Sequence, residues 1–225
     1  MKQTVLFIVI CLVYSIGAFG QTGEAIYSIS GNTIVTKSTF IDTFFVDHSE
    51  ILTPYVHKKT ETIIPSSAYG VFSLRLSTFN GYEDEAGMCN VIEILRDGMR
   101  ILQLTNSNGF ESISSYVKTE KGDYTLVSLS TNTYALIFNE WIYASQPSMV
   151  SIILIRNGEV KLVYNKPMFI NSLTKQAGSL SMTLQSNTSE YLDYDKDPKP
   201  VDPPELHTLW WDGSVLRFWS NDTNQ

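Results

Sequence analysis

Apolar and polar side chains alternate with a period of two along much of this chain, whereas helical periodicity is nearly absent. In residues 69–79, Phe72, Leu74 and Leu76 alternate with serine and arginine side chains. Such alternation is typical of a strand with one buried face and one face in water. The same pattern or a β-rich composition predicts strands in residues 26–29, 39–46, 91–95, 126–130, 134–138 and 180–184. Short helical turns are expected only in residues 171–176 and 112–116.

Residues 149–155 differ from the alternating segments because every side chain but one is apolar. A run this short between turn residues is too short for a typical helix and suits a strand that is buried on both faces. We therefore expect it to be a central strand, covered by other elements on each side.

Three Asp-Gly or Asn-Gly pairs stand between apolar runs, at Asp97-Gly98, Asn157-Gly158 and Asp212-Gly213. These pairs favour two-residue hairpin turns in which both residues have positive φ. Hairpins in succession indicate antiparallel pairing. The sequence thus predicts an all-β fold, an antiparallel two-sheet sandwich or a jelly-roll-like arrangement.

Residues 1–20 have the pattern of a secretory signal peptide, with Lys2, then an apolar run, then small residues ending at Gly20. We expect cleavage near Gly20-Gln21 and a secreted or periplasmic protein; an N-terminal membrane anchor is the alternative. Residues 21–225 are expected to form a single domain. Cleavage would leave Cys89 as the one cysteine, which predicts no internal disulfide and a small buried apolar side chain.

The composition excludes several further classes of protein and of binding partner. Hydrophobic residues make up 43% of the chain and charged residues 17%, which is unlike a disordered protein. The isoelectric point of about 4.9 argues against nucleic acid as a partner. No second long apolar stretch follows the signal sequence, so no membrane span is expected in the mature chain.

Residues 191–205 contain four of the eight prolines and many acidic side chains, which predicts an extended connector. Asp193, Asp195 and Asp197 alternate there in a pattern that can converge on a calcium ion. Pro198 and Pro204 stand where a calcium loop of the EF-hand type requires Gly and Glu. Calcium is therefore the one cofactor that the sequence suggests, with a solvated acidic connector as the alternative.

The catalytic inventory is thin, and no catalytic residue can be assigned from the sequence. The three histidines, His48, His57 and His207, have no metal-binding spacing, and no nucleophile or phosphate-binding motif is present. Glu83, Asp84 and Glu85 lie together in an expected loop, and paired carboxylates are sufficient for glycoside hydrolysis. Because catalytic motifs are lacking and one acidic cluster is the main candidate, the sequence favours a protein that is not an enzyme.

The most specific binding hypothesis rests on the aromatic hairpin of residues 206–219, with Trp210, Trp211 and Trp219. Neighbours on a strand point to opposite faces, so Trp210 and Trp211 cannot enter one core together. An exposed tryptophan beside polar groups suits a sugar ring or a protein partner. The sequence therefore predicts an exported, non-enzymatic binding or assembly module for glycans or an envelope protein. A carboxylate-dependent hydrolase of extracellular polymers and a self-associating surface protein are the alternatives.

Overall fold

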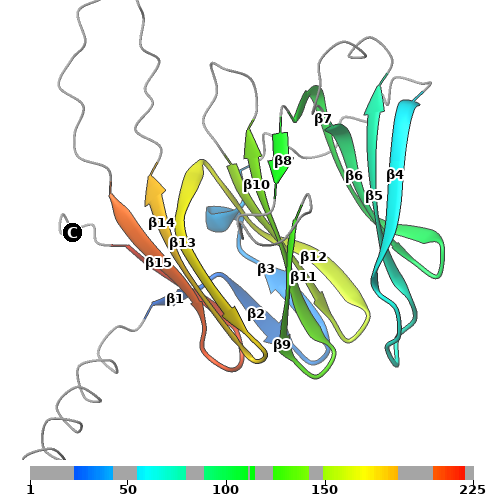
Figure 1. Cartoon of the computed structure of the whole chain (residues 1–225). Helices are drawn as coiled ribbons and strands as arrows, with labels where there is room; N and C mark the ends of the chain where they lie inside the picture. Colours follow the sequence, from blue (N-terminus) through cyan, green and yellow to red (C-terminus); the bar gives the residue numbers. More distant parts are fainter. Residues whose placement is uncertain are drawn as a thin grey trace, which may run out of the picture.

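The protein is a layered antiparallel β-structure in a computed structural model that describes residues 23–42, 55–79, 89–110, 112–114, 124–141, 149–186 and 205–220. Three sheets stack on one another, with one of them in the middle (Figure 1). The predicted all-β, antiparallel sandwich is confirmed, but its sheets form three layers where the sequence predicts two. Within the described part, no helix has the length and apolar character needed to cross a membrane.

Each layer is built mainly from strands that follow one another in the chain. The flanking sheet has the order β4-β5-β6-β7, formed by Tyr55–Ile64, Phe72–Phe79, Cys89–Arg96 and Met99–Phe110. The central sheet has the order β12-β11-β10, with β8 and β9 both pairing with β10. In chain order, its strands β8 to β12 are Ser112–Ser114, Thr125–Ser130, Thr133–Trp141, Met149–Arg156 and Glu159–Lys166. The C-terminal sheet has the order β1-β16-β15-β14-β13, formed by Glu24–Ala25, Leu216–Ser220, Leu206–Trp211, Ser179–Ser186 and Met168–Gln176.

Strand β11 is the middle of the molecule, and the prediction that residues 149–155 are covered on both faces is confirmed. Val150, Ile152 and Leu154 belong to the core between the central and C-terminal sheets. Met149, Ile153 and Ile155 belong to a second core, between the central and flanking sheets. Because successive side chains on a strand point to opposite faces, one run that is apolar except for Ser151 supplies both cores.

A β-bulge in β12 distributes its side chains between the same two cores. Ile152 pairs with Tyr164 and Ile153 pairs with Leu162, so Val163 is an extra residue on β12. As a result, Leu162 packs into the second core while Val163 and Tyr164 both pack into the first. A bulge of this kind re-aims side chains without ending the strand.

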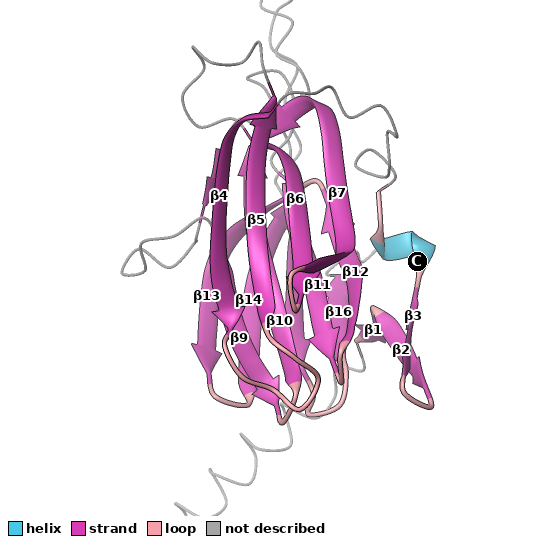
Figure 2. Ribbon diagram, turned by 90° about the vertical axis from the view of Figure 1, so that its right-hand side faces the viewer, coloured by secondary structure: helices cyan, strands magenta, loops and turns pink. Residues whose placement is uncertain are grey.

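The first described segment, residues 23–42, closes the side of the core between the central and C-terminal sheets (Figure 2). Ile26, which follows β1, is buried in this core, and the hairpin of β2 (Tyr27–Ser30) and β3 (Thr33–Thr36) adds buried Tyr27 and Ile34. The Ile34 amide donates a hydrogen bond of 2.6 Å to a carboxylate oxygen of Glu159 on the edge strand β12.

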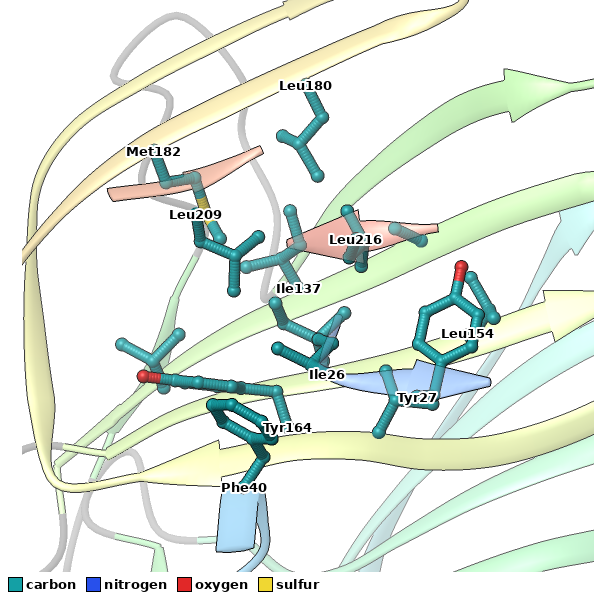
Figure 3. Close-up of a cluster of buried hydrophobic side chains, with 14 of the residues drawn as sticks. Ile26, Tyr27, Phe40, Ile137, Leu154, Tyr164, Leu180, Met182, Leu209 and Leu216 are labelled. Atoms are coloured by element: carbon teal, nitrogen blue, oxygen red, sulfur yellow. The ribbon is translucent and has the colours of Figure 1, made fainter. Parts of the chain in front are cut away.

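A short 3-10 helix, η1 (Ser38–Phe40), follows, and its Phe40 is buried among the labelled core side chains in Figure 3. Asp42 N then donates to the Asn165 carbonyl at 2.8 Å. The prediction of a strand in residues 39–46 is therefore wrong for its first part: Phe40 enters the core from a helical turn, and only Ile41 forms an isolated bridge, with Asn165. Residues 43–46 lie outside the described part.

Tight turns gather at one end of the layers, and two of the three predicted turns have the expected conformation. Asp97 and Gly98 have φ of 51° and 82°, and Asn157 and Gly158 have φ of 47° and 84°. Both pairs therefore form two-residue hairpin turns with positive φ throughout, as predicted. The turn of β6–β7 also contacts that of β11–β12, where Arg96 Nη1 donates to the Gly158 carbonyl at 3.3 Å.

The third hairpin, β15–β16, forms as predicted but with a different turn. Trp211 pairs with Leu216, which leaves a four-residue connection, and there Gly213 has a φ of 97° while Asp212 has no positive φ. The expected two-residue geometry is wrong here because the Asp212 carboxylate accepts hydrogen bonds from the following backbone and fixes a wider turn.

Two further expectations are corrected. Residues 171–176 belong to strand β13 and residues 112–114 to strand β8, rather than to helical turns. Strand β13 is at the sheet edge and keeps Ser172 and Thr174 in water, so the apolar alternation that identifies other strands is weak there. The alternation of residues 72–76 is confirmed, with Phe72, Leu74 and Leu76 buried.

The turns allow a matched test of backbone strain. Substitution of Gly98 or Gly158 by Ala places a Cβ on a residue with positive φ, which should cost about 1 kcal/mol of unfolding free energy in each case. At Gly158 the added Cβ also meets Tyr69 Cβ at 3.0 Å, whereas at Gly98 nothing lies within 4 Å. Urea unfolding should therefore show a larger loss for Gly158→Ala than for Gly98→Ala. An equal or smaller loss at Gly158 contradicts the packing of the two layers at this end.

Candidate functional site

The hairpin β15–β16 divides its aromatic side chains between the two faces of the C-terminal sheet. Leu209 is fully buried and Trp211 packs against the same core, so both point inward. On the partner strand, Leu216 is fully buried and Phe218 packs against that core. The alternating residues Trp210 and Trp219 therefore lie on the outer face, as the opposed directions of strand neighbours require.

The three predicted tryptophans thus do not form one cluster. Trp210 pairs in register with Arg217, and Thr208 pairs with Trp219, so the two outer tryptophans are diagonal neighbours on adjacent strands. Diagonal neighbours on one face are about 7 Å apart, within reach of large side chains. Both are partly exposed. Trp211 is separated from them by the sheet itself, and a binding role for the three residues remains a prediction.

Trp210 lies across the neighbouring strand β16 and reaches Gly23, the residue before β1. A Cβ built on Gly23 would overlap Cη2 of the indole and would lie 2.9 Å from Cζ3. The far edge of the six-membered ring therefore packs directly on the glycine backbone. Because no side chain stands at position 23, the indole can lie over the sheet rather than project from it.

Arg217, beside Trp210, is fixed by two partners. Its Nη1 donates a 3.0 Å hydrogen bond to the Gly23 carbonyl, and its Nε donates to the Asp212 carboxylate. The guanidinium is thereby held against the backbone of the first described segment. Its charge is compensated by Asp212, so it adds little net charge to the face.

Asp212 accepts several hydrogen bonds in the turn of this hairpin. Ser214 N and Oγ each donate to Oδ1 at 2.8 Å, and Val215 N donates to it at 2.9 Å. Partial burial by itself raises the pKa of this carboxyl, but the hydrogen bonds from Val215, Ser214 and Arg217 outweigh it and lower the pKa to about 2. The carboxylate is therefore charged throughout the ordinary pH range and stabilises the turn.

Hydroxyl side chains extend from the two tryptophans across the sheet in two rows. Strand register places Trp210 beside Ser181, and Ser181 beside Thr174. Register likewise places Thr208 beside Trp219 on one side and beside Thr183 on the other, with Ser172 next in that row. Ser172, Thr174 and Ser181 are exposed. We call the outward residues of strands β13, β14, β15 and β16 the outer face. They are Phe169, Asn171, Ser172, Thr174, Gln176, Ser179, Ser181, Thr183, Gln185, Leu206, Thr208, Trp210, Arg217 and Trp219.

The inner side of the same hairpin is an aromatic part of the core. Phe218 contacts the rings of Phe40 and Tyr164, with centroids 5.6 Å and 6.0 Å away. His207 stacks on Phe218 at 5.2 Å, and its Nε2 lies 3.7 Å from Glu205 Oε2. Burial raises the pKa of the Tyr164 hydroxyl well above its usual range, so this group stays protonated. The inner side therefore supports the outer face structurally.

The remaining predicted site residues are not tested by the structure. Asp193, Asp195 and Asp197 lie outside the described residues, as do Glu83, Asp84 and Glu85. His48 also lies outside them, and the side chains of His57 and Cys89 are not described. Among the residues that the structure does describe, no group of three His, Cys, Asp or Glu side chains could hold a metal ion.

Sequence reasoning missed an ionic network on the flanking sheet. Glu93 stands within the apolar run 91–95 and is 6% exposed. Its carboxylate lies 3.3 Å from Arg75 Nη1 and 3.6 Å from Arg100 Nη1. Arg75 also donates to Thr60 Oγ1 at 3.3 Å. A lone carboxylate in an apolar strand, with an arginine at an outward position of the preceding strand, is the signal that could have identified this pair.

Comparison of the chain with protein-family models, with curated proteins and with solved structures finds no match.

The Asp212 turn gives a pH-dependent prediction. The pKa of Asp212 is lower in the folded state than the ordinary 3.8, so its stabilising effect is complete above about pH 4 and is lost as the pH falls toward 2. Asp212→Asn should lower the unfolding free energy by about 1 kcal/mol at pH 7 and by progressively less below pH 4. Urea unfolding of both proteins from pH 7 to 2.5 measures this difference. A difference that stays constant down to pH 2.5 contradicts the role of the charged carboxylate.

Proposed function

We propose that this protein is an exported, non-enzymatic binding module of the β-sandwich class and that the outer face is its ligand surface. The observation that carries the proposal is the placement of Trp210 and Trp219 together, partly exposed, on one face of a sheet whose other face is a buried core. Partly exposed tryptophans beside polar side chains are typical of surfaces that bind sugars or proteins.

The cost of keeping these residues exposed supports a binding role. Burying a large aromatic side chain contributes about 2 to 3 kcal/mol, so a fold optimised for stability alone gains nothing from leaving two indoles partly in water. The chain instead keeps Gly23 beneath Trp210 and the Asp212–Arg217 pair beside it. These contacts fix the side chains in position before any ligand arrives, which reduces the entropy lost on binding.

Export is supported by the signal-like residues 1–20, which precede the first described residue, Gly23. A ligand outside the cell or in the envelope follows from this location. The glycan or envelope protein expected from the sequence is consistent with such a ligand. The outer face offers stacking and hydrogen-bonding groups, which suit binding rather than bond cleavage.

The test compares retention on a cell-envelope preparation from the producing organism. The protein is collected from the periplasm or medium, where its N-terminus is expected at Gln21. We expect Trp210→Ala and Trp219→Ala each to weaken retention about tenfold, because each removes one stacking platform. Tyr69→Ala is the matched control, since Tyr69 is 41% exposed and lies at the end of the flanking sheet.

Circular dichroism must show that the variants remain folded. Equal retention of the wild type and both tryptophan variants would argue against the outer face as a ligand surface. A loss of retention in Tyr69→Ala of similar size would show that any exposed aromatic residue gives the effect.

A further inference from the structure

We infer that the ligand of the outer face is an extended, uncharged polysaccharide that lies across strands β16, β15, β14 and β13. This inference rests on the proposed function and narrows it to one ligand chemistry. It is carried by three features of the described residues: the charge of the face, the spacing of its hydroxyl groups and the predominance of Ser and Thr over aliphatic side chains in its middle.

The side-chain charges of the outer face do not suit a polyanionic ligand. Among the described outward positions of β13 to β16, Arg217 is the one charged side chain, and Asp212 compensates it. Binding to nucleic acids or acidic polysaccharides depends on several basic groups that neutralise the negative charges of the polymer. The outer face offers no such set, so an uncharged ligand fits it better.

The hydroxyl rows match a chain of sugar units. One row is Trp210, Ser181 and Thr174, and the other is Trp219, Thr208, Thr183 and Ser172. Adjacent strands are about 4.8 Å apart, which is close to the advance of one pyranose unit in an extended glycan. A polymer running across the strands can therefore stack one ring on an indole and place the following units over successive hydroxyl side chains.

The chemistry of these side chains also suits sugars. Ser and Thr hydroxyls can donate and accept hydrogen bonds, as sugar hydroxyls do. Asn171 and Gln185 add amide groups at the far side of the face, where Asn171 Nδ2 donates to Gln185 Oε1 at 3.0 Å. The apolar face of a sugar ring packs well on the face of an indole, and Trp210, which reaches across β16 to Gly23, is partly exposed on this side of the sheet.

A protein partner fits this surface less well. The centres of protein interfaces are apolar and close-packed. Apart from the tryptophans, the apolar side chains of the outer face are Phe169 and Leu206, both at the end away from the turn of Asp212. The middle of the face is occupied by Ser and Thr, which contribute little apolar area. Protein binding is accordingly an outcome that the experiment must be able to show.

The experiment uses native affinity electrophoresis of the mature protein in gels that contain hydroxyethylcellulose, laminarin, arabinoxylan, galactomannan or polygalacturonate. We expect retardation by at least one of the four neutral polymers and none by the acidic polygalacturonate. Trp210→Ala and Trp219→Ala should each reduce the affinity about tenfold. Thr183→Val, which replaces a hydroxyl by a methyl of similar size in the middle of a row, should reduce it about threefold, while the exposed Ser128→Ala on β9 should leave it unchanged.

Calorimetry with oligosaccharides of the retarding polymer then tests the orientation. Affinity should rise with length up to about four units, because four strands contribute to the rows, and then level off. Affinity that does not depend on length overturns the placement across the strands. Retardation by polygalacturonate alone, or by none of the polymers, overturns the inference.

Retention on the envelope preparation distinguishes failure of the polysaccharide inference from failure of the proposed binding function. Periodate cleaves vicinal diols, which 1,4-linked sugar units have and 1,3-linked units lack. It should therefore abolish retention on a 1,4-linked ligand, whereas proteinase K treatment of the preparation should leave retention on any polysaccharide intact. Tryptophan-dependent retention that survives periodate and is lost after proteinase K overturns the polysaccharide ligand and leaves the binding surface in place. Retention that depends on neither tryptophan overturns both the polysaccharide inference and the proposed function.

Discussion

Burial of strand β11 on both faces is the constraint on which the arrangement of the other sheets depends. Every side chain from Met149 to Ile155 is buried, and those on one face belong to a different core from those on the other. A single strand of this kind cannot exist at the surface, because it would expose at least three large apolar side chains to water. The flanking sheet and the C-terminal sheet must therefore each cover one face of the central sheet. The bulge at Val163 serves the same division on the neighbouring strand β12.

The proposed ligand surface is a consequence of this arrangement. Since the C-terminal sheet covers one face of the central sheet, its inner side chains are committed to the core, and Leu209 and Leu216 are fully buried there. Alternation then forces Trp210 and Trp219 outward. The first described segment contributes twice, because it closes the edge of the core with Phe40 and also provides Gly23 beneath Trp210. The core and the proposed ligand surface thus use opposite sides of the same hairpin.

Much of this fold could be predicted from local patterns. The continuous run of residues 149–155 identified the central strand, the Asp97-Gly98 and Asn157-Gly158 pairs identified their turns, and strand alternation required Trp210 and Trp211 to point to opposite faces. These features depend on neighbours in the chain. The number of layers does not depend on neighbours in the chain, because it is set by contacts between sheets whose residues are far apart in the sequence. The packing of Trp210 on Gly23 joins residues near opposite ends of the chain, so no local pattern could show it. Strand β13 was missed because an edge strand with exposed Ser172 and Thr174 has little apolar alternation.

Two adjacent residues of β11 offer the most direct test of the three-layer arrangement. Ile152 and Ile153 are both fully buried, one in each core. Urea unfolding of Ile152→Ala and Ile153→Ala measures the two cores separately, since each variant removes the same atoms from one of them. Coverage of both faces predicts that each substitution lowers the unfolding free energy by about 2 to 4 kcal/mol. If either substitution costs less than about 1 kcal/mol, that face of the central sheet is not buried and the account is contradicted.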